Sequence, residues 1–147
     1  MSRVVCDEKL CSGCLACVVA CMDQHYDETQ TDAVSLRIYE KRTSQRTGMV
    51  RYITRSCLHC ENAACMQVCP MKVFEKNTQG FVITSHQERC IGCRKCLQAC
   101  PHDVPRFNQG NKIVKCDGCS VRVANGLEPA CVRSCNTGAL RWPGDRR

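Results

Sequence analysis

The cysteines of this 147-residue chain are the residues whose spacing indicates a particular chemistry. Groups one and three of these cysteines follow C-x2-C-x2-C-x3-C, the spacing with which thiolates bind cubane [4Fe–4S] clusters. The sequence predicts four such clusters, since sixteen of the seventeen cysteines form four complete ligand sets. In chain order, the four groups are Cys11, Cys14, Cys17 and Cys21; Cys57, Cys60, Cys65 and Cys69; Cys90, Cys93, Cys96 and Cys100; and Cys116, Cys119, Cys131 and Cys135.

A cysteine fraction this high is also typical of small secreted domains held by disulfides. The spacings here are those of metal sites, and residues 1–5 contain neither an apolar core nor a twin-arginine pair of a signal peptide. We therefore expect a reducing, low-oxygen cytoplasm. No apolar run approaches the ~18 residues that a membrane span needs, so direct membrane insertion is not expected.

The formal net charge of +7 would suit a nucleic-acid partner, but this value counts the cysteines as neutral thiols. Sixteen bound thiolates add about −16 and four oxidised cubane cores return about +2 each, a change of about −8. The loaded protein would then carry a net charge of about −1. We expect many of the Lys and Arg residues to compensate buried anionic clusters, and we expect no nucleic-acid binding.

The order of the groups predicts an α+β fold with two tandem ferredoxin-like modules, each holding two clusters. Group three repeats group one at a distance of 79 residues, and groups two and four share C-x2-C, a longer gap and C-x3-C. Because the chain has few large apolar residues, the clusters are expected to staple the fold.

Residues 22–56 contain no cysteine and are predicted to be an insertion. Its stretches 34–41 and 49–55 are β-like and flank a polar turn over 42–48, which predicts a β-hairpin. Two roles stay open for this hairpin, a lid over one pair of clusters or a docking arm for a partner subunit.

The chain resembles the four-cluster iron–sulfur subunits of molybdopterin and tungstopterin oxidoreductases, a group that includes dimethyl sulfoxide reductase and formate dehydrogenase β-subunits. It is also similar in size and cluster count to the small iron–sulfur subunit of some tungsten aldehyde oxidoreductases. The segments that carry the resemblance are 11–17, 57–60 with Cys65 and Cys69-Pro70, 90–96, 115–119 with 129–131 and Cys135, and 137–139.

The resemblance implies that each cluster takes its fourth ligand from another group, as in two-cluster ferredoxins. It implies a first ferredoxin-like module of residues 1–21 with 107–147, and a second of residues 57–106. The implied ligand sets are Cys11, Cys14 and Cys17 with Cys135; Cys116, Cys119 and Cys131 with Cys21; Cys57, Cys60 and Cys65 with Cys100; and Cys90, Cys93 and Cys96 with Cys69. The sequence alone does not establish this exchange.

The expected function is electron transfer without substrate chemistry. The resemblance implies a large pterin-containing catalytic subunit as partner, with a flavin- or NAD-linked subunit or a ferredoxin as acceptor. Two alternatives stay open, a free polyferredoxin shuttle and a self-associating wire in which copies form a filament. We find no nucleotide-binding glycine motif, flavin fingerprint or catalytic triad.

A few further residues could contribute to these centres. Cys6 lies outside every group and is expected to be a plain buried thiol. His59 lies inside a cysteine loop, where it would either pack or tune a potential, and Trp142 would either shield a cluster or anchor a partner. No site is predicted for the remaining histidines, His25, His86 and His102.

Overall fold

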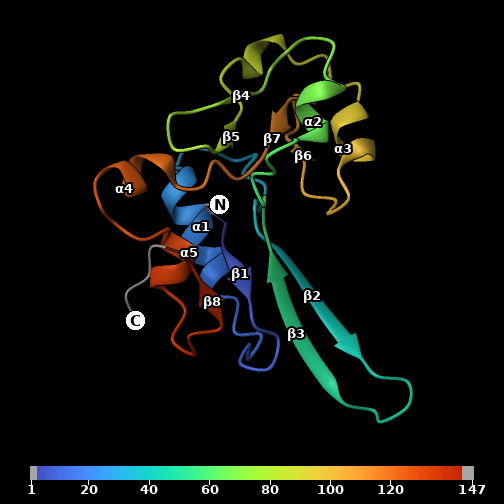
Figure 1. Cartoon of the computed structure of the whole chain (residues 1–147), viewed down its shortest axis with the longest axis vertical. Coiled ribbons are helices and arrows are strands. Elements are labelled where there is room, and N and C mark those ends of the chain that lie inside the picture. Colours follow the sequence, from blue (N-terminus) through green and yellow to red (C-terminus); the bar gives the residue numbers. More distant parts are fainter. Residues whose placement is uncertain (1–2, 144–147) are drawn as a thin grey trace.

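The computed structural model describes residues 3–143, a mixed α/β fold of short helices and strands (Figure 1). Within these residues the helices are α1 (Ala16–His25), α2 (Ala64–Gln67), α3 (Lys95–Ala99), α4 (Ser120–Ala124) and α5 (Ala130–Arg133), with a 3-10 turn at Gln87–Arg89. The strands are β1 (Val5–Cys6), β2 (Ile38–Thr43), β3 (Val50–Arg55), β4 (Glu75–Lys76), β5 (Val82–Ile83), β6 (Arg106–Phe107), β7 (Ile113–Val114) and β8 (Leu140–Arg141). None of these helices has the length and apolar character needed to cross a lipid bilayer.

The strands form two-stranded antiparallel ladders, β1 with β8, β2 with β3, β4 with β5, and β6 with β7. Figure 1 shows two lobes, one with β1, α1, α4, α5 and β8, the other with α2, α3 and the ladders β4–β5 and β6–β7. In the first lobe Val5 is paired with Arg141, so the two ends of the described chain close one lobe together. The residues of the predicted first module at 1–2 and 144–147 lie outside the described part.

Each lobe has its own small apolar core, and cysteines form part of both. In the second lobe Cys90 and Cys96 are buried with Phe74, Val82 and Ile113. In the first lobe, Cys17 and Cys131 are buried with Val132 and Leu140, and Cys6 packs against them. Because the thiol side chains supply so much of the buried surface, the core and the candidate metal centres are the same part of the molecule.

The cysteine loops depend on left-handed backbone that allows close approach. Gly13 and Gly118 occupy the third position of their C-x-x-C loops, with φ values of 73° and 74°. A Cβ atom on Gly13 would lie 2.7 Å from the ring of Tyr52, and one on Gly118 would lie 2.6 Å from the ring of Phe81. Both positions therefore require glycine for conformation and for space.

The hairpin β2–β3 extends away from both lobes (Figure 1). Its register runs from Ile38 opposite Arg55 to Thr43 opposite Val50, so β2 begins later than the predicted start at residue 34 and continues into the predicted turn. The late start is explained by Arg37, the residue before β2, which turns its side chain inward and is only 1% exposed. The hairpin thus has a buried base and an exposed tip.

Candidate metal centres

Four cavities in the structure are each lined by four cysteines or more. Cavity A is lined by Cys11, Cys14, Cys17 and Cys135; cavity B by Cys21, Cys116, Cys119 and Cys131; cavity C by Cys57, Cys60, Cys65 and Cys100; and cavity D by Cys69, Cys90, Cys93 and Cys96. Cys57 also reaches the wall of cavity B. Each cavity thus combines three cysteines of one group with one of another, and iron binding by these sets stays a prediction.

The helices explain this exchange of cysteines. On α1, Cys17 faces cavity A and Cys21, four residues later, faces cavity B. Helix α5, which packs against α1, places its cysteines in the opposite order. Its Cys131 lines cavity B, and Cys135, just after the helix, lines cavity A. Residues four apart lie on one side of a helix, one turn from each other. Two contacting helices can therefore serve two neighbouring cavities.

Helices α2 and α3 repeat this arrangement in the second lobe. Cys65 and Cys96 line cavities C and D respectively, and the cysteine four residues after each lines the other cavity. The two helices contact one another. The internal repeat of the sequence thus corresponds to a repeated pair of helices.

Backbone amides point at several of the sulfur atoms. The N–H groups of Gly92 and Ile113 both donate to Cys90 Sγ at 3.4 Å, and Gly118 N donates to Cys116 Sγ at the same distance. Leu140 N donates to Cys135 Sγ at 3.4 Å. Such donors stabilise a negatively charged sulfur, because a hydrogen bond to the charged form of a group favours that form.

Burial makes ionisation unfavourable for several of the thiols that line these cavities. Burial, together with the charges of neighbouring cysteines, raises the pKa of Cys119 to about 12 and that of Cys131 to about 11. All seventeen cysteines are free of disulfides, so the sulfurs around each cavity remain available. The four thiols of cavity B, whose pKa values are all raised, fit the ligand set of an iron–sulfur cluster, whose binding displaces their protons.

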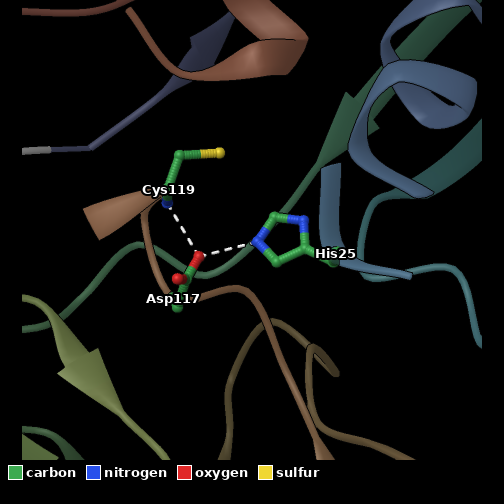
Figure 2. Close-up of side chains that lie close together, drawn as sticks. All are labelled: His25, Asp117 and Cys119. Atoms are coloured by element: carbon green, nitrogen blue, oxygen red, sulfur yellow. Dashed lines mark hydrogen bonds and ion pairs between the residues drawn. The ribbon is translucent and has the colours of Figure 1, made fainter. Parts of the chain in front are cut away.

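A half-buried ion pair joins α1 to the loop of the fourth cysteine group (Figure 2). His25 Nε2 lies 2.8 Å from Asp117 Oδ1, which also accepts from the backbone N–H of Cys119 at 2.8 Å. His25 Nδ1 lies 2.8 Å from the carbonyl oxygen of Cys21. Because both ring nitrogens face acceptors, the protonated form of the imidazole is favoured. The pair therefore holds Cys21 close to Cys119.

The titration behaviour of the two residues agrees with this ion pair. Burial opposes the charge on His25, but the hydrogen bonds to Asp117 and Cys21 outweigh it and raise the pKa of the imidazole. Burial likewise opposes the charge on Asp117, but the bond to His25 lowers the pKa of the carboxyl to about 2. Sequence reasoning assigned no site to His25, whereas the structure places it beside cavity B. Since His25, Asp117 and Cys119 offer ligand atoms within 4.8 Å, they resemble a small metal site, but Asp117 is already engaged by its donors.

His59 lies between cavities B and C. It occupies the position that is glycine in the other three loops, with a left-handed φ of 49°. Its Nδ1 accepts a hydrogen bond from Val82 N at 3.1 Å, so Nε2 carries the proton and points at Cys116 Sγ, 3.9 Å away. Burial lowers the pKa of His59 to about 3, and the ring is neutral. Its ring packs edge-on against Phe81, so packing and contact with a cysteine are combined in one side chain.

The other sequence candidates also have defined places. Trp142 lines cavity B and packs against Phe81 with ring centroids 5.9 Å apart, an arrangement that shields this cavity. Cys6 is half-buried rather than fully buried. It is absent from the walls of cavities A to D but lies near Cys11, whose pKa is raised by burial and, to a lesser degree, by Cys6. Of the two remaining histidines, His102 lines the wall of cavity C, whereas His86 lines none of the four cavities.

Comparisons with known proteins identify the class to which this arrangement belongs. Residues 10–73 and 48–145 each match a family model described as a 4Fe-4S dicluster domain. The chain is 40% identical to the B subunit of anaerobic dimethyl sulfoxide reductase from Haemophilus influenzae over 145 residues, which cover 91% of this chain and 69% of that relative. The corresponding Escherichia coli protein is 38% identical over 144 residues, with the same coverage of 91% and 69%.

A more distant relative is the iron-sulfur subunit of the nitrate-inducible formate dehydrogenase of Escherichia coli, 32% identical over 92% of this chain and 52% of that subunit. The protein described here belongs to the 4Fe-4S dicluster family that includes these iron–sulfur subunits of oxidoreductases. It is an iron–sulfur electron-transfer protein, and in its relatives catalysis is carried by other subunits.

Proposed function

We propose that the chain carries four [4Fe–4S] clusters and relays single electrons between a pterin-containing catalytic subunit and an acceptor. The observation that supports this function is the set of four cavities, each lined by the four cysteines of one expected ligand set. The cysteines of cavities A to D would hold one cluster each, and a bound cluster supplies reversible one-electron chemistry. The relatives named for dimethyl sulfoxide reductase and formate dehydrogenase support a catalytic partner of this kind.

Cysteines of neighbouring cavities interact electrostatically, which supports a linear relay. Electrostatic interaction links Cys17 of cavity A with Cys131 of cavity B. Cys116 of cavity B interacts in the same way with Cys57 of cavity C. Cys65 of cavity C interacts with Cys96 of cavity D. The cavities therefore follow one another in the order A, B, C, D.

The exposure of the cysteines supports entry and exit of electrons at the two outer cavities. Cys14 of cavity A and Cys93 of cavity D are exposed, whereas every cysteine of cavities B and C is buried or half-buried. Apolar side chains next to both sulfurs are exposed as well, Leu15 at 39% and Ile91 at 61%. Exposed apolar surface beside a redox centre suits contact with another protein.

The hairpin supports a partner with an acidic surface. Its strands and turn, residues 38–55, contain five basic residues and one acidic residue, a net charge of +4. Glu40 pairs with Arg42 and Arg55, so Lys41, Arg46 and Arg51 have no carboxylate partner among residues 3–143. We therefore assign the tip of the hairpin to docking on the catalytic subunit, and its base to covering cavities A and B. The cytoplasm stays our predicted compartment.

The first expected result is the iron content. Anaerobically purified protein should contain about sixteen iron atoms per chain, by counting four for each cubane. Colorimetric iron and sulfide analysis of the same sample measures both elements. A value near eight atoms would contradict four clusters.

The second expected result concerns catalysis. Sixteen of the described thiols converge on the four cavities, and the His25–Asp117 pair beside cavity B is already engaged in its own ion pair and hydrogen bonds. The isolated chain should therefore exchange electrons with viologen dyes yet turn over no substrate. Turnover should appear on addition of the catalytic subunit that copurifies with the chain. Reduction of an organic substrate by the isolated chain would refute the proposed role. Copurification of no catalytic subunit would favour a free shuttle, and long filaments under the electron microscope would favour a wire.

A further inference from the structure

Two basic side chains are buried in the middle of the proposed relay without an acidic partner. Arg37 is 1% exposed and Lys115 is 5% exposed. Neither takes part in any of the ion pairs that join the described residues. A buried charge is costly unless an opposite charge or several hydrogen bonds compensate it, and Arg and Lys are almost never fully buried without such a partner. Another negative charge must therefore compensate these two cations.

Arg37 lies at the junction of cavities A and B. Its guanidinium donates to the hydroxyls of Thr54 and Ser56, both at 3.0 Å, and to Cys131 Sγ of cavity B at 3.7 Å. Thr54 Oγ1 in turn lies 3.7 Å from Cys17 Sγ of cavity A. The two hydroxyls, with the carbonyl oxygen of Thr54 at 3.3 Å, accept hydrogen bonds from the guanidinium without neutralising its charge. The charged group lines cavity B directly.

Lys115 has the corresponding place between cavities B and C. Its ammonium donates to the carbonyl oxygens of Val82 and Cys116, which are neutral acceptors. Burial raises the pKa of Cys57 and of Cys65 in cavity C, and Lys115 opposes that increase for both thiols. It has the same opposing effect on Cys116 of cavity B. The ammonium thus acts on cysteines of both inner cavities.

With Asp117 already paired to His25, the cysteine thiolates that hold a bound cluster are the anions available to both cations among residues 3–143. Four thiolates and an oxidised cubane core together carry a charge of about −2, and each one-electron reduction adds one further negative charge without adding an atom. A fixed positive charge nearby stabilises the reduced form more than the oxidised form, because the attraction grows with the negative charge. The effect is large where water is excluded, as at these two side chains.

From these contacts we infer that Arg37 and Lys115 are built-in counter-charges that raise the reduction potentials of the two inner clusters, at cavities B and C, relative to the same clusters without them. The inference rests on the proposed function, since it requires clusters in those cavities. Both residues act through the cysteine ligands and are positioning residues. His59 between the same cavities is neutral and adds a hydrogen-bond donor but no charge.

The test is a redox titration of the loaded protein followed by electron paramagnetic resonance, with Arg37→Gln and Lys115→Met as the variants. Each change is expected to lower the equilibrium constant for reduction of one inner cluster at least tenfold, which is about 59 mV for a one-electron couple. Both variants should move the signal of the cluster at cavity B, and Lys115→Met should also move that of the cluster at cavity C. The signal of the cluster at cavity D, which neither side chain contacts, should stay in place. Arg46→Gln at the tip of the hairpin removes the same charge from an exposed position and should move none.

The outcomes are distinguishable from failure of the four-cluster proposal, because iron analysis of the unmodified protein tests that proposal alone. If Arg37→Gln keeps its iron and every potential is unchanged, the inference is wrong. If Arg37→Gln loses iron while the charge-conserving Arg37→Lys retains it, the charge is needed even to hold the cluster, which supports the inference. Loss of iron in both variants would indicate a packing role and overturn it.

Discussion

Replacing Cys21 by alanine is expected to lower the iron content from about sixteen to about twelve atoms per chain, with loss of the cluster at cavity B. Cys21 lies on α1 together with Cys17, but its sulfur faces Cys116, Cys119 and Cys131. Burial and the charges of these three cysteines all raise the pKa of Cys21, which indicates how closely they surround it. Iron analysis and the spectrum of each cluster measure the loss.

Double variants identify the cluster that Cys21 serves. If Cys21 and Cys119 hold one cluster, the two alanine substitutions together should remove no more iron than either alone, because effects within one unit are not additive. Cys21→Ala combined with Cys14→Ala should instead remove about eight atoms, since two clusters are affected. Cys6→Ala is the matched control, because this cysteine lies outside all four cavities and the iron content should not change. The opposite pattern of additivity would show that the ligand sets are assigned incorrectly.

Shortening the hairpin is expected to weaken binding of the catalytic subunit at least tenfold while leaving the iron content at its full value. Lys41 and Tyr52 face one another in the ladder, so an Asn-Gly turn can join them directly in place of residues 42–51. This variant keeps Tyr52 against Gly13, and it keeps Arg37 and Thr54 near the cysteines. Titration of the catalytic subunit by calorimetry measures the change in affinity.

The binding should also become less sensitive to salt, since the removed residues carry basic charge and exposed charges are screened by ions. Arg89→Gln, which removes a charge from an exposed residue in the other lobe, is the control and should leave the affinity unchanged. Equal affinity of the shortened and the unmodified chain would contradict the docking role. Removal of the whole segment 22–56 would be a poor test, because its buried base supports cavities A and B.

The positions of the cysteine loops and the hairpin could be predicted because both leave local patterns in the sequence. Spacing within each group specifies a tight loop, and a glycine such as Gly13 marks its left-handed residue. The left-handed conformations of Leu15 and Arg94 could not be predicted in this way, since such residues rarely adopt φ values of 63° and 60°. At these two positions the geometry of the cysteine loop overrides the backbone preference of the residue itself.

The buried cation Arg37 could not be predicted for a different reason. An arginine next to a β-like stretch is ordinarily expected on the surface. Its hydrogen-bonding partners Thr54 and Ser56 follow a full hairpin later, and Cys131 lies near the other end of the chain. His25 is similar, because its partner Asp117 is 92 residues away. Pairs so distant leave no periodicity in a single sequence, whereas the cysteine groups do.

The pairing of β1 with β8 has a consequence for the order in which the protein matures. Cavities C and D draw all eight of their cysteines from residues 57–100, so both can be completed while the remainder of the chain is still being synthesised. Cavities A and B must wait for Cys131 and Cys135, and their lobe closes only when Val5 meets Arg141. A chain still being synthesised would therefore contain one completed lobe and one open lobe whose thiols hold no cluster. Oxidation by oxygen or formation of a premature disulfide would affect this open lobe.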